Sequence, residues 1–286
     1  MVDYHAVVSA LVSRLRSARR APVTEAPTTA TVLADAEPYI GGTGPNGVLL
    51  CHGFSGSPRS LRPWAEHLAA DGFRVVLPRL PGHGTTWQEL NQTRWQDFYG
   101  HVDRAFTELR GECERVFVGG LSMGGGLAIR IAEQHGPAVA GVAVVNPAIA
   151  STDLRIRALP VLRHLLPSLA GIGSDIAMPG VLEGAYDRSA LHAGWSVTRM
   201  WRDIQDNLGR VDQPLLIFKS VKDRVVDELS LKLIKARVSS RDLTVVPLER
   251  SYHVATLDYD AELIFTTSSA FFRRLAGEEH ERVART

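Results

Sequence analysis

The chain has little cysteine, almost no net charge and no long hydrophobic run, and each shortage excludes a class of protein. Only two of the 286 residues are cysteines, and both lie in apolar segments, which argues against a disulfide framework or a cysteine-based metal site. The 32 basic residues are balanced by 31 acidic ones, so no nucleic-acid partner is expected. No stretch approaches 18 consecutive apolar residues, which argues against a transmembrane helix.

Residues 1–36 are predicted to form an extension outside the main domain. An amphipathic pattern near the start is followed by a stretch rich in proline, threonine and alanine at residues 21–30, which is typical of a linker. The arginines follow the apolar stretch, an order that is wrong for a secretory signal, so we expect a cytoplasmic protein. An arginine-rich amphipathic helix suits an anionic membrane surface, although such extensions are more often solvated or packed on their own domain.

The remaining residues, 37–286, predict one α/β domain in which strands and helices alternate. Apolar, β-branched runs typical of strands occur at residues 47–51, 73–77, 115–118, 140–145, 215–218 and 243–247. Helical patterns occupy residues 61–70, 95–110, 123–134, 228–236 and 261–275. This alternation predicts right-handed crossovers and a mostly parallel, doubly wound sheet with helices on both faces.

One long interval, from about residue 147 to 208, breaks the alternation between the strand-like runs at 140–145 and 215–218. Its apolar residues cluster without strand spacing; they include Leu159, Val161, Leu162, Leu165, Leu166, Leu169 and Ile172. We therefore predict an inserted cap. A leucine-rich cap over a cleft suits an acyl chain, although these side chains would equally serve to pack the cap onto the body.

A serine stands among five glycines directly after one strand-like run, in the stretch V-F-V-G-G-L-S-M-G-G-G at residues 116–126. Ser122 is the centre of a G-x-S-x-G pattern between a predicted strand and a predicted helix. A sharp turn there holds the hydroxyl out at the carboxyl edge of the sheet, where the helix N-terminus favours developing negative charge. The pattern indicates a catalytic nucleophile, and the competing interpretation is a helix-capping serine.

A nucleophilic serine needs a histidine base that is oriented by a carboxylate. Asp223 and His253 each lie just beyond a predicted strand end and follow Ser122 in the order Ser, Asp, His. Asp227 is an alternative acid, but we expect it to cap the helix that starts near residue 228. Asp258 and Asp260 follow His253 too closely to reach its far ring nitrogen.

The reaction also needs backbone donors for an oxyanion. The turn after the first strong strand-like run would bring the N–H of Phe54 opposite the N–H of Met123, which follows the nucleophile. His52 and His83 are predicted to be structural loop residues. The glycine-rich loops lack the lysine of a phosphate-binding loop and the spacing of a dinucleotide fingerprint, so we expect neither a cofactor nor a metal.

Several stretches together resemble the bacterial monoacylglycerol lipases of the α/β-hydrolase superfamily. They are H-G-F-S-G-S-P (52–58), L-P-R-L-P-G-H-G-T (77–85), F-V-G-G-L-S-M-G-G (117–125), G-I-G-S-D (171–175) and S-Y-H-V-A-T-L-D-Y-D (251–260). The resemblance implies an α/β-hydrolase fold and the triad and oxyanion hole given above. It also implies a cap that admits one acyl chain, with Glu183 holding the glycerol hydroxyls and Ile172 lining the same pocket. The extension has no counterpart in the family, and Val221 and Lys222 replace a more acidic segment.

The sequence therefore predicts a serine hydrolase that cleaves monoacylglycerols to glycerol and fatty acid through an acyl-enzyme. The alternatives are a broad short-chain carboxylesterase or lysophospholipase and, from another class, a ligand sensor on the same fold. The expected partner is a small lipid ester, with peripheral membrane contact through the N-terminal helix or the cap. The oligomeric state is not encoded in any pattern of the sequence.

Overall fold

A computed structural model describes residues 28–171 and 173–277. The predicted N-terminal helix and Ile172 lie outside these described residues. Within them, the helices are all too short or too polar to cross a membrane.

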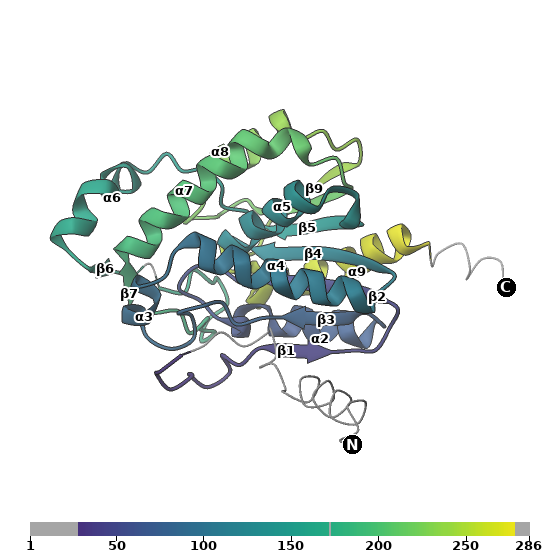
Figure 1. The fold of residues 1–286 in the computed structure, drawn as a ribbon, viewed down its shortest axis with the longest axis horizontal. Helices are drawn as coiled ribbons and strands as arrows, with labels where there is room; N and C mark the ends of the chain where they lie inside the picture. The colour runs from purple at the N-terminus through teal and green to yellow at the C-terminus, as the bar shows by residue number, and fades with distance from the viewer. Residues whose placement is uncertain (1–27, 172, 278–286) are drawn as a thin grey trace, which may run out of the picture.

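Seven strands form the central sheet (Figure 1). They are β1 (Tyr39–Gly41), β2 (Asn46–Cys51), β3 (Arg74–Leu77), β4 (Arg115–Leu121), β5 (Gly141–Val145), β8 (Leu215–Ser220) and β9 (Leu243–Leu248). Their order across the sheet is β1-β3-β2-β4-β5-β8-β9, and only β1, at one edge, runs antiparallel to its neighbour. The predicted mostly parallel sheet is confirmed.

Helices cover both faces of this sheet and create two apolar cores (Figure 1). One face carries α4 (Trp95–Glu112), α5 (Met123–His135), α7 (Leu191–Asn207) and α8 (Glu228–Arg237). The other carries α2 (Arg62–Ala70) and α9 (Ala261–Ala276). Alternate residues of β2 enter opposite cores, Leu49 on one side and Val48 and Leu50 on the other, because successive strand side chains point to opposite faces. Both faces are covered, which explains why the central strands are mostly apolar.

The parallel strands end in register at one edge of the sheet. Cys51 pairs with Gly120, Leu121 with Val145, and Ser220 of β8 with the last residue of β9. The residues that follow these strands therefore share one edge, which is where open α/β sheets bind ligands.

The interval between β5 and β8 contains two parts that pack differently. α6 (Leu154–Leu165) has no buried residue, and it projects at the periphery beside the antiparallel pair β6 (Ser168–Ala170) and β7 (Arg188–Ala190) (Figure 1). α7 instead buries Met200 and Ile204 in the main core. The remaining elements are α3 (Trp87–Asn91) and the 3-10 turns Pro58–Leu61, Gly136–Ala138, Leu208–Arg210 and Ala255–Leu257.

Candidate active site

Ser122 lies in the sharp turn between β4 and α5. Its φ of 56° and ψ of −119° belong to a backbone region that side-chain-bearing residues rarely adopt. The neighbouring glycines permit this turn: a Cβ on Gly120 would lie 2.4 Å from the Gly124 oxygen, and a Cβ on Gly124 would lie 1.9 Å from the Cys51 oxygen. The Ser122 N–H donates to the Val145 oxygen at 3.0 Å, which fixes the serine at the end of β5 as well.

Asp223 and His253 meet across the ends of β8 and β9. Nδ1 of His253 lies 3.0 Å from Oδ1 of Asp223, and both side chains are almost fully buried. The same oxygen accepts the N–H groups of Val225 and Val226 at 2.9 Å each, so the carboxylate is held by its own loop. An aspartate in this position fixes the tautomer of the imidazole and leaves Nε2 free to accept a proton.

Lys219, near the end of β8, binds the second oxygen of Asp223. Its buried Nζ lies 2.7 Å from Oδ2 and also donates to the Val226 oxygen at 2.7 Å. Burial alone would raise the pKa of Asp223, but the hydrogen bond and charge of His253, together with the charge of Lys219, hold that pKa well below its usual range. The carboxylate is therefore charged around neutral pH.

Two further polar side chains hold the backbone of the histidine loop. Asp175 accepts the His253 N–H through Oδ2 at 3.1 Å. Asn146, which follows β5 and is fully buried, donates through Nδ2 to the His253 oxygen at 2.8 Å and to Oγ of Ser220 at 2.9 Å. Its Oδ1 accepts the Ser220 N–H at 2.8 Å. One amide thus connects the ends of β5 and β8 to the loop after β9.

The two predicted oxyanion donors belong to the segments that adjoin Ser122. Met123 is the first residue of α5, so its N–H has no acceptor one turn earlier in the helix. Phe54 follows β2, and its loop passes close to the serine, because a Cβ on Gly53 would lie 3.7 Å from the Cβ of Ser122. This arrangement is compatible with two amides directed at one oxygen beside the hydroxyl.

His52 and His83 support the loop that carries Phe54. Nε2 of His52 accepts the Leu80 N–H at 3.1 Å, so the proton of this imidazole is on Nδ1, which lies 3.0 Å from the Gly53 oxygen. Burial lowers the pKa of His52 well below its ordinary value and that of His83 to about 4. Both rings are neutral around pH 7, as a structural role requires.

Glu183 places a buried carboxylate beside this loop. A Cβ on Gly56 would lie 2.6 Å from Oε1 of Glu183, and the Glu183 N–H donates to Oγ of Ser174 at 2.9 Å. Burial raises the pKa of Glu183 to about 7, although the nearby His253 acts in the opposite direction. Among the described residues, no basic side chain forms an ion pair with this carboxylate, which leaves its oxygens available to a ligand.

The other aspartates weighed from the sequence are engaged elsewhere. Asp227 caps α8 by accepting the Leu229 N–H at 2.9 Å, as predicted. Asp258 accepts the N–H groups of Ala177 and Tyr252, and Asp260 accepts those of Arg250 and Ser251. His253 Nδ1 faces Asp223 instead.

The chain matches a known family over most of its length. The model of the Hydrolase_4 family, described as serine aminopeptidase, S33, matches residues 45–260. The chain belongs to this α/β-hydrolase family. The hydrolase is 40% identical over 251 residues to the thermostable monoacylglycerol lipase of Bacillus sp. (strain H-257), an alignment that covers 86% of this chain and 98% of the relative. The resemblance predicted from the motifs is confirmed.

Solved structures agree with this assignment. A structure from work on two metagenome-derived lipolytic enzymes, LipS and LipT, is 38% identical to the hydrolase, with a TM-score of 0.83, and covers 85% of this chain and 100% of that one. A monoacylglycerol lipase from Paleococcus ferrophilus is 21% identical with a TM-score of 0.70, over 83% of this chain and 98% of that one, and supports the fold alone.

Three residues of the hydrolase that contact the triad or its loop were not predicted from the sequence: Lys219, Asn146 and Asp175. Each had a weak signal. Lys219 is a charged residue that directly follows four apolar residues of its strand, and Asn146 is a polar residue that directly follows an apolar strand. Asp175 closes the stretch G-I-G-S-D, which contributed to the resemblance without a role. Contacts of this kind depend on which strand ends become neighbours.

Proposed function

We propose that this hydrolase cleaves the ester bond of monoacylglycerols through an acyl-enzyme formed on Ser122. The observation that carries the proposal is the 3.0 Å pairing of His253 with Asp223 at the sheet edge where Ser122 occupies its strained turn. The 40% identical monoacylglycerol lipase supports the substrate class. The intact pair also favours an enzyme over a ligand sensor on the same fold.

In the proposed first half of the reaction, Nε2 of His253 takes the proton of Ser122 as the serine oxygen attacks the ester carbonyl. Asp223 holds the Nδ1–H and stabilises the imidazolium that forms. The N–H groups of Phe54 and Met123 bind the oxyanion, and each such donor contributes about 3 kcal/mol to transition-state stabilisation. His253 then protonates the departing glycerol oxygen.

In the second half, water attacks the acyl-enzyme after losing a proton to Nε2 of His253. The tetrahedral intermediate again places its oxyanion between the same two amides. Collapse breaks the bond to the serine oxygen, which recovers its proton from the imidazolium, and releases the fatty acid. The free enzyme is restored without a cofactor.

Glu183 is proposed to bind the glycerol hydroxyls. A buried carboxylate next to the loop that carries Phe54 accepts hydrogen bonds from a diol and disfavours anionic head groups. Ile172, which lies outside the described residues, is proposed to line the same pocket. A carboxylate at this position would select the leaving group rather than the acyl chain.

The interval 147–208 is proposed to act as the cap, and its outer part is proposed to contact lipid surfaces. On α6, Leu154 and Leu165 are each 71% exposed and Val161 is 65% exposed, alongside Arg155 and Arg157. Neighbouring leucines and arginines on one exposed helix suit the boundary between acyl chains and anionic head groups. The predicted contribution of the N-terminal segment falls outside the described residues.

The test combines active-site labelling with a substrate panel. A fluorophosphonate probe with peptide mapping should label Ser122, and labelling should vanish in Ser122→Ala. Rates on monoacyl-, diacyl- and triacylglycerols, lysophospholipids and short-chain esters should be highest on monoacylglycerols. Preference for short-chain simple esters would instead assign a carboxylesterase, and labelling of another residue would overturn the mechanism.

A further inference from the structure

Lys219 brings a third charge to the buried pair of Asp223 and His253. Its Nζ lies 2.7 Å from Oδ2 of Asp223, and its side chain is only 7% exposed. The side chains of Asp223 and His253 are 1% and 8% exposed, so all three groups are withdrawn from water. Charges in such a place act on one another more strongly than charges at the surface, because little solvent screens them.

Two hydrogen bonds fix the ammonium group of Lys219. It donates to the carboxylate of Asp223 and to the Val226 oxygen, both at 2.7 Å. The other carboxylate oxygen, Oδ1, accepts the N–H groups of Val225 and Val226 and faces Nδ1 of His253 at 3.0 Å. The lysine and the imidazole are therefore bound to different oxygens of one carboxylate.

The lysine changes the net charge that results when the base takes up a proton. Lys219 and Asp223 form a neutral pair, so a proton on His253 gives the three residues a net positive charge. Without the lysine, the same proton would complete a neutral pair of aspartate and imidazolium. A cation on the far side of the carboxylate thus offsets part of the stabilisation that the aspartate gives to the imidazolium.

Further carboxylates lie around the loop that carries His253. Asp175 accepts the His253 N–H at 3.1 Å, and Asp258 and Asp260 accept neighbouring N–H groups of the same loop. Glu183 is buried close by, and burial raises its pKa to about 7, although the charge of His253 acts in the opposite direction. All of these groups remain when Lys219 alone is replaced, so a difference from the wild type is assigned to the lysine.

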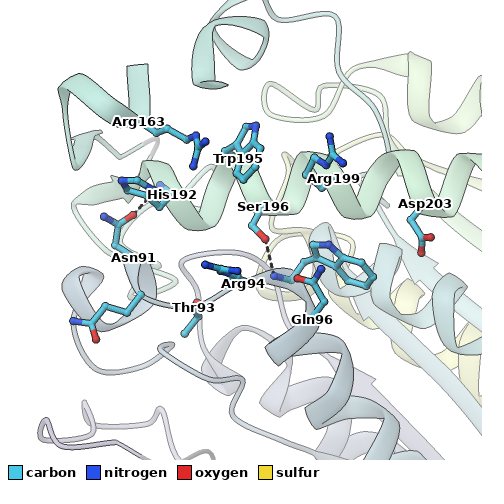
Figure 2. A pocket seen from close by; sticks show the side chains of 12 residues that line it. Asn91, Thr93, Arg94, Gln96, Arg163, His192, Trp195, Ser196, Arg199 and Asp203 are labelled. Atoms are coloured by element: carbon cyan, nitrogen blue, oxygen red, sulfur yellow. Dashed lines mark hydrogen bonds between the residues drawn. The ribbon is translucent and has the colours of Figure 1, made fainter. Parts of the chain in front are cut away.

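Among the described residues, no arginine shares the carboxylate of Asp223. The guanidinium carbon of Arg224 lies 3.9 Å from the centroid of the Tyr252 ring, and its Nη1 lies 4.0 Å from Oδ1 of Asp175. Other arginines line a polar cavity of about 610 Å³ between α3, α4, α6 and α7 (Figure 2). Neither Asp223 nor His253 lines that cavity.

We infer that Lys219 is a positioning residue that lowers the pH at which His253 becomes available as the base. The inference rests on the esterase mechanism proposed above. The lysine holds the aspartate against the histidine and offsets the carboxylate charge, which keeps the imidazole neutral and able to accept a proton at more acidic pH. The hydrolase is therefore active at lower pH than the same triad would be without the lysine.

The rate at which a fluorophosphonate probe labels Ser122, measured across pH, tests this role. Labelling requires the neutral form of His253, so its rate falls on the acid side as the imidazole takes up a proton. In Lys219→Met, the pH of half-maximal labelling should rise by about half a pH unit or more, which is about a threefold loss of rate on the acid side. Thermal melting at each pH verifies that the protein is folded.

Two more variants at this position separate charge from packing. Lys219→Gln also removes the charge but keeps a hydrogen-bond donor, and it replaces the methionine variant if that variant does not fold. Lys219→Arg keeps both the charge and the donors, so it should keep the wild-type pH of half-maximal labelling.

Lys222→Met is the matched control for the loss of one positive charge. Lys222 is exposed and lies in the loop that follows the same strand. At an ionic strength of about 0.15 M, salt and water screen an exposed charge, so the control should keep the wild-type profile.

Three outcomes overturn the inference. The first is an unchanged profile in the neutral variants of Lys219. The second is an equal shift in Lys219→Arg, which would assign the effect to packing, and the third is an equal shift in Lys222→Met, which would assign it to net charge. Failure of the proposed function has a different signature, because the wild-type protein would then show no labelling of Ser122 at any pH.

Discussion

The two carboxylate oxygens of Asp223 are divided between two partners, His253 on Oδ1 at 3.0 Å and Lys219 on Oδ2 at 2.7 Å. The lysine is buried, so the aspartate is not an isolated charge behind the histidine but the centre of a three-residue arrangement.

Lys219→Met should lower the free energy of unfolding at pH 7 by about 3 kcal/mol, because it leaves the buried charge of Asp223 without its cationic partner. The pKa of Asp223 is lowered in the folded protein, so its stabilisation is present above the unfolded value and lost as the pH falls. The deficit of the variant should therefore shrink at acidic pH, where its Asp223 takes up a proton. Urea unfolding of both proteins at several pH values measures this deficit in the free energy of unfolding. Lys222 is exposed, so the control variant Lys222→Met should keep the free energy of unfolding of the wild type. An equal loss in Lys219→Met and Lys222→Met would contradict the ion-pair explanation.

Ser122→Ala should abolish turnover of p-nitrophenyl esters while leaving the fold intact, and Ser122→Gly should do the same with a gain in stability. Glycine adopts the φ of 56° without the strain that a Cβ causes. We expect the free energy of unfolding of the glycine variant, measured by urea titration, to exceed that of the alanine variant by about 1 kcal/mol. Retained turnover in either variant would remove Ser122 from the mechanism.

Glu183→Ala should reduce the rate on a monoacylglycerol more than the rate on the methyl ester of the same fatty acid. The reason is that only the glycerol ester presents hydroxyl groups to the carboxylate. Values of kcat/KM for the two esters, measured in both proteins, give the comparison. Equal losses would leave Glu183 without a role in leaving-group recognition.

Glu183→Gln should also change how stability depends on pH. Burial raises the pKa of Glu183 from 4.5 to about 7, so the folded state binds more protons than the unfolded state in that window. The contribution of this group to stability therefore falls as the pH rises from 4.5 to 7. Above pH 7 the variant should be more stable than the wild type by about 3 kcal/mol, because each unit of the pKa difference corresponds to about 1.4 kcal/mol. Thermal melts of Glu183→Gln and the wild type at pH 4.5 and pH 8 test this prediction. The same difference in melting temperature at both pH values would refute it.

Local patterns were sufficient to predict the main strands and the helices between most of them. The run expected at residues 47–51 became β2 (Asn46–Cys51), and the serine turn lies between a strand and a helix as its glycines indicated. Such segments carry their own signal, because fully buried parallel strands are continuously apolar. The three-residue strands β1, β6 and β7 were not predicted, since strands that short offer too few residues to display a period.

The supporting contacts of the site required knowledge of which strands become neighbours. Asp223 and His253 were found because each follows its own strand, which is a local feature. Asn146 gains its partners only because β5 lies beside β8 and the loop after β9 folds back over both. No spacing in the chain encodes that contact. The same holds for Asp175, which reaches His253 from the interval between β5 and β8.

Asn146 uses both ends of its amide at once, as a donor to the His253 oxygen and as an acceptor from the Ser220 N–H. An aspartate there would keep the acceptor but lose the donor, and a leucine would keep only the volume. In saturation mutagenesis scored by activity, Asn146 should therefore tolerate substitution as poorly as the residues proposed to carry out the chemistry. A designer enlarging the substrate range of this hydrolase has to leave it unchanged.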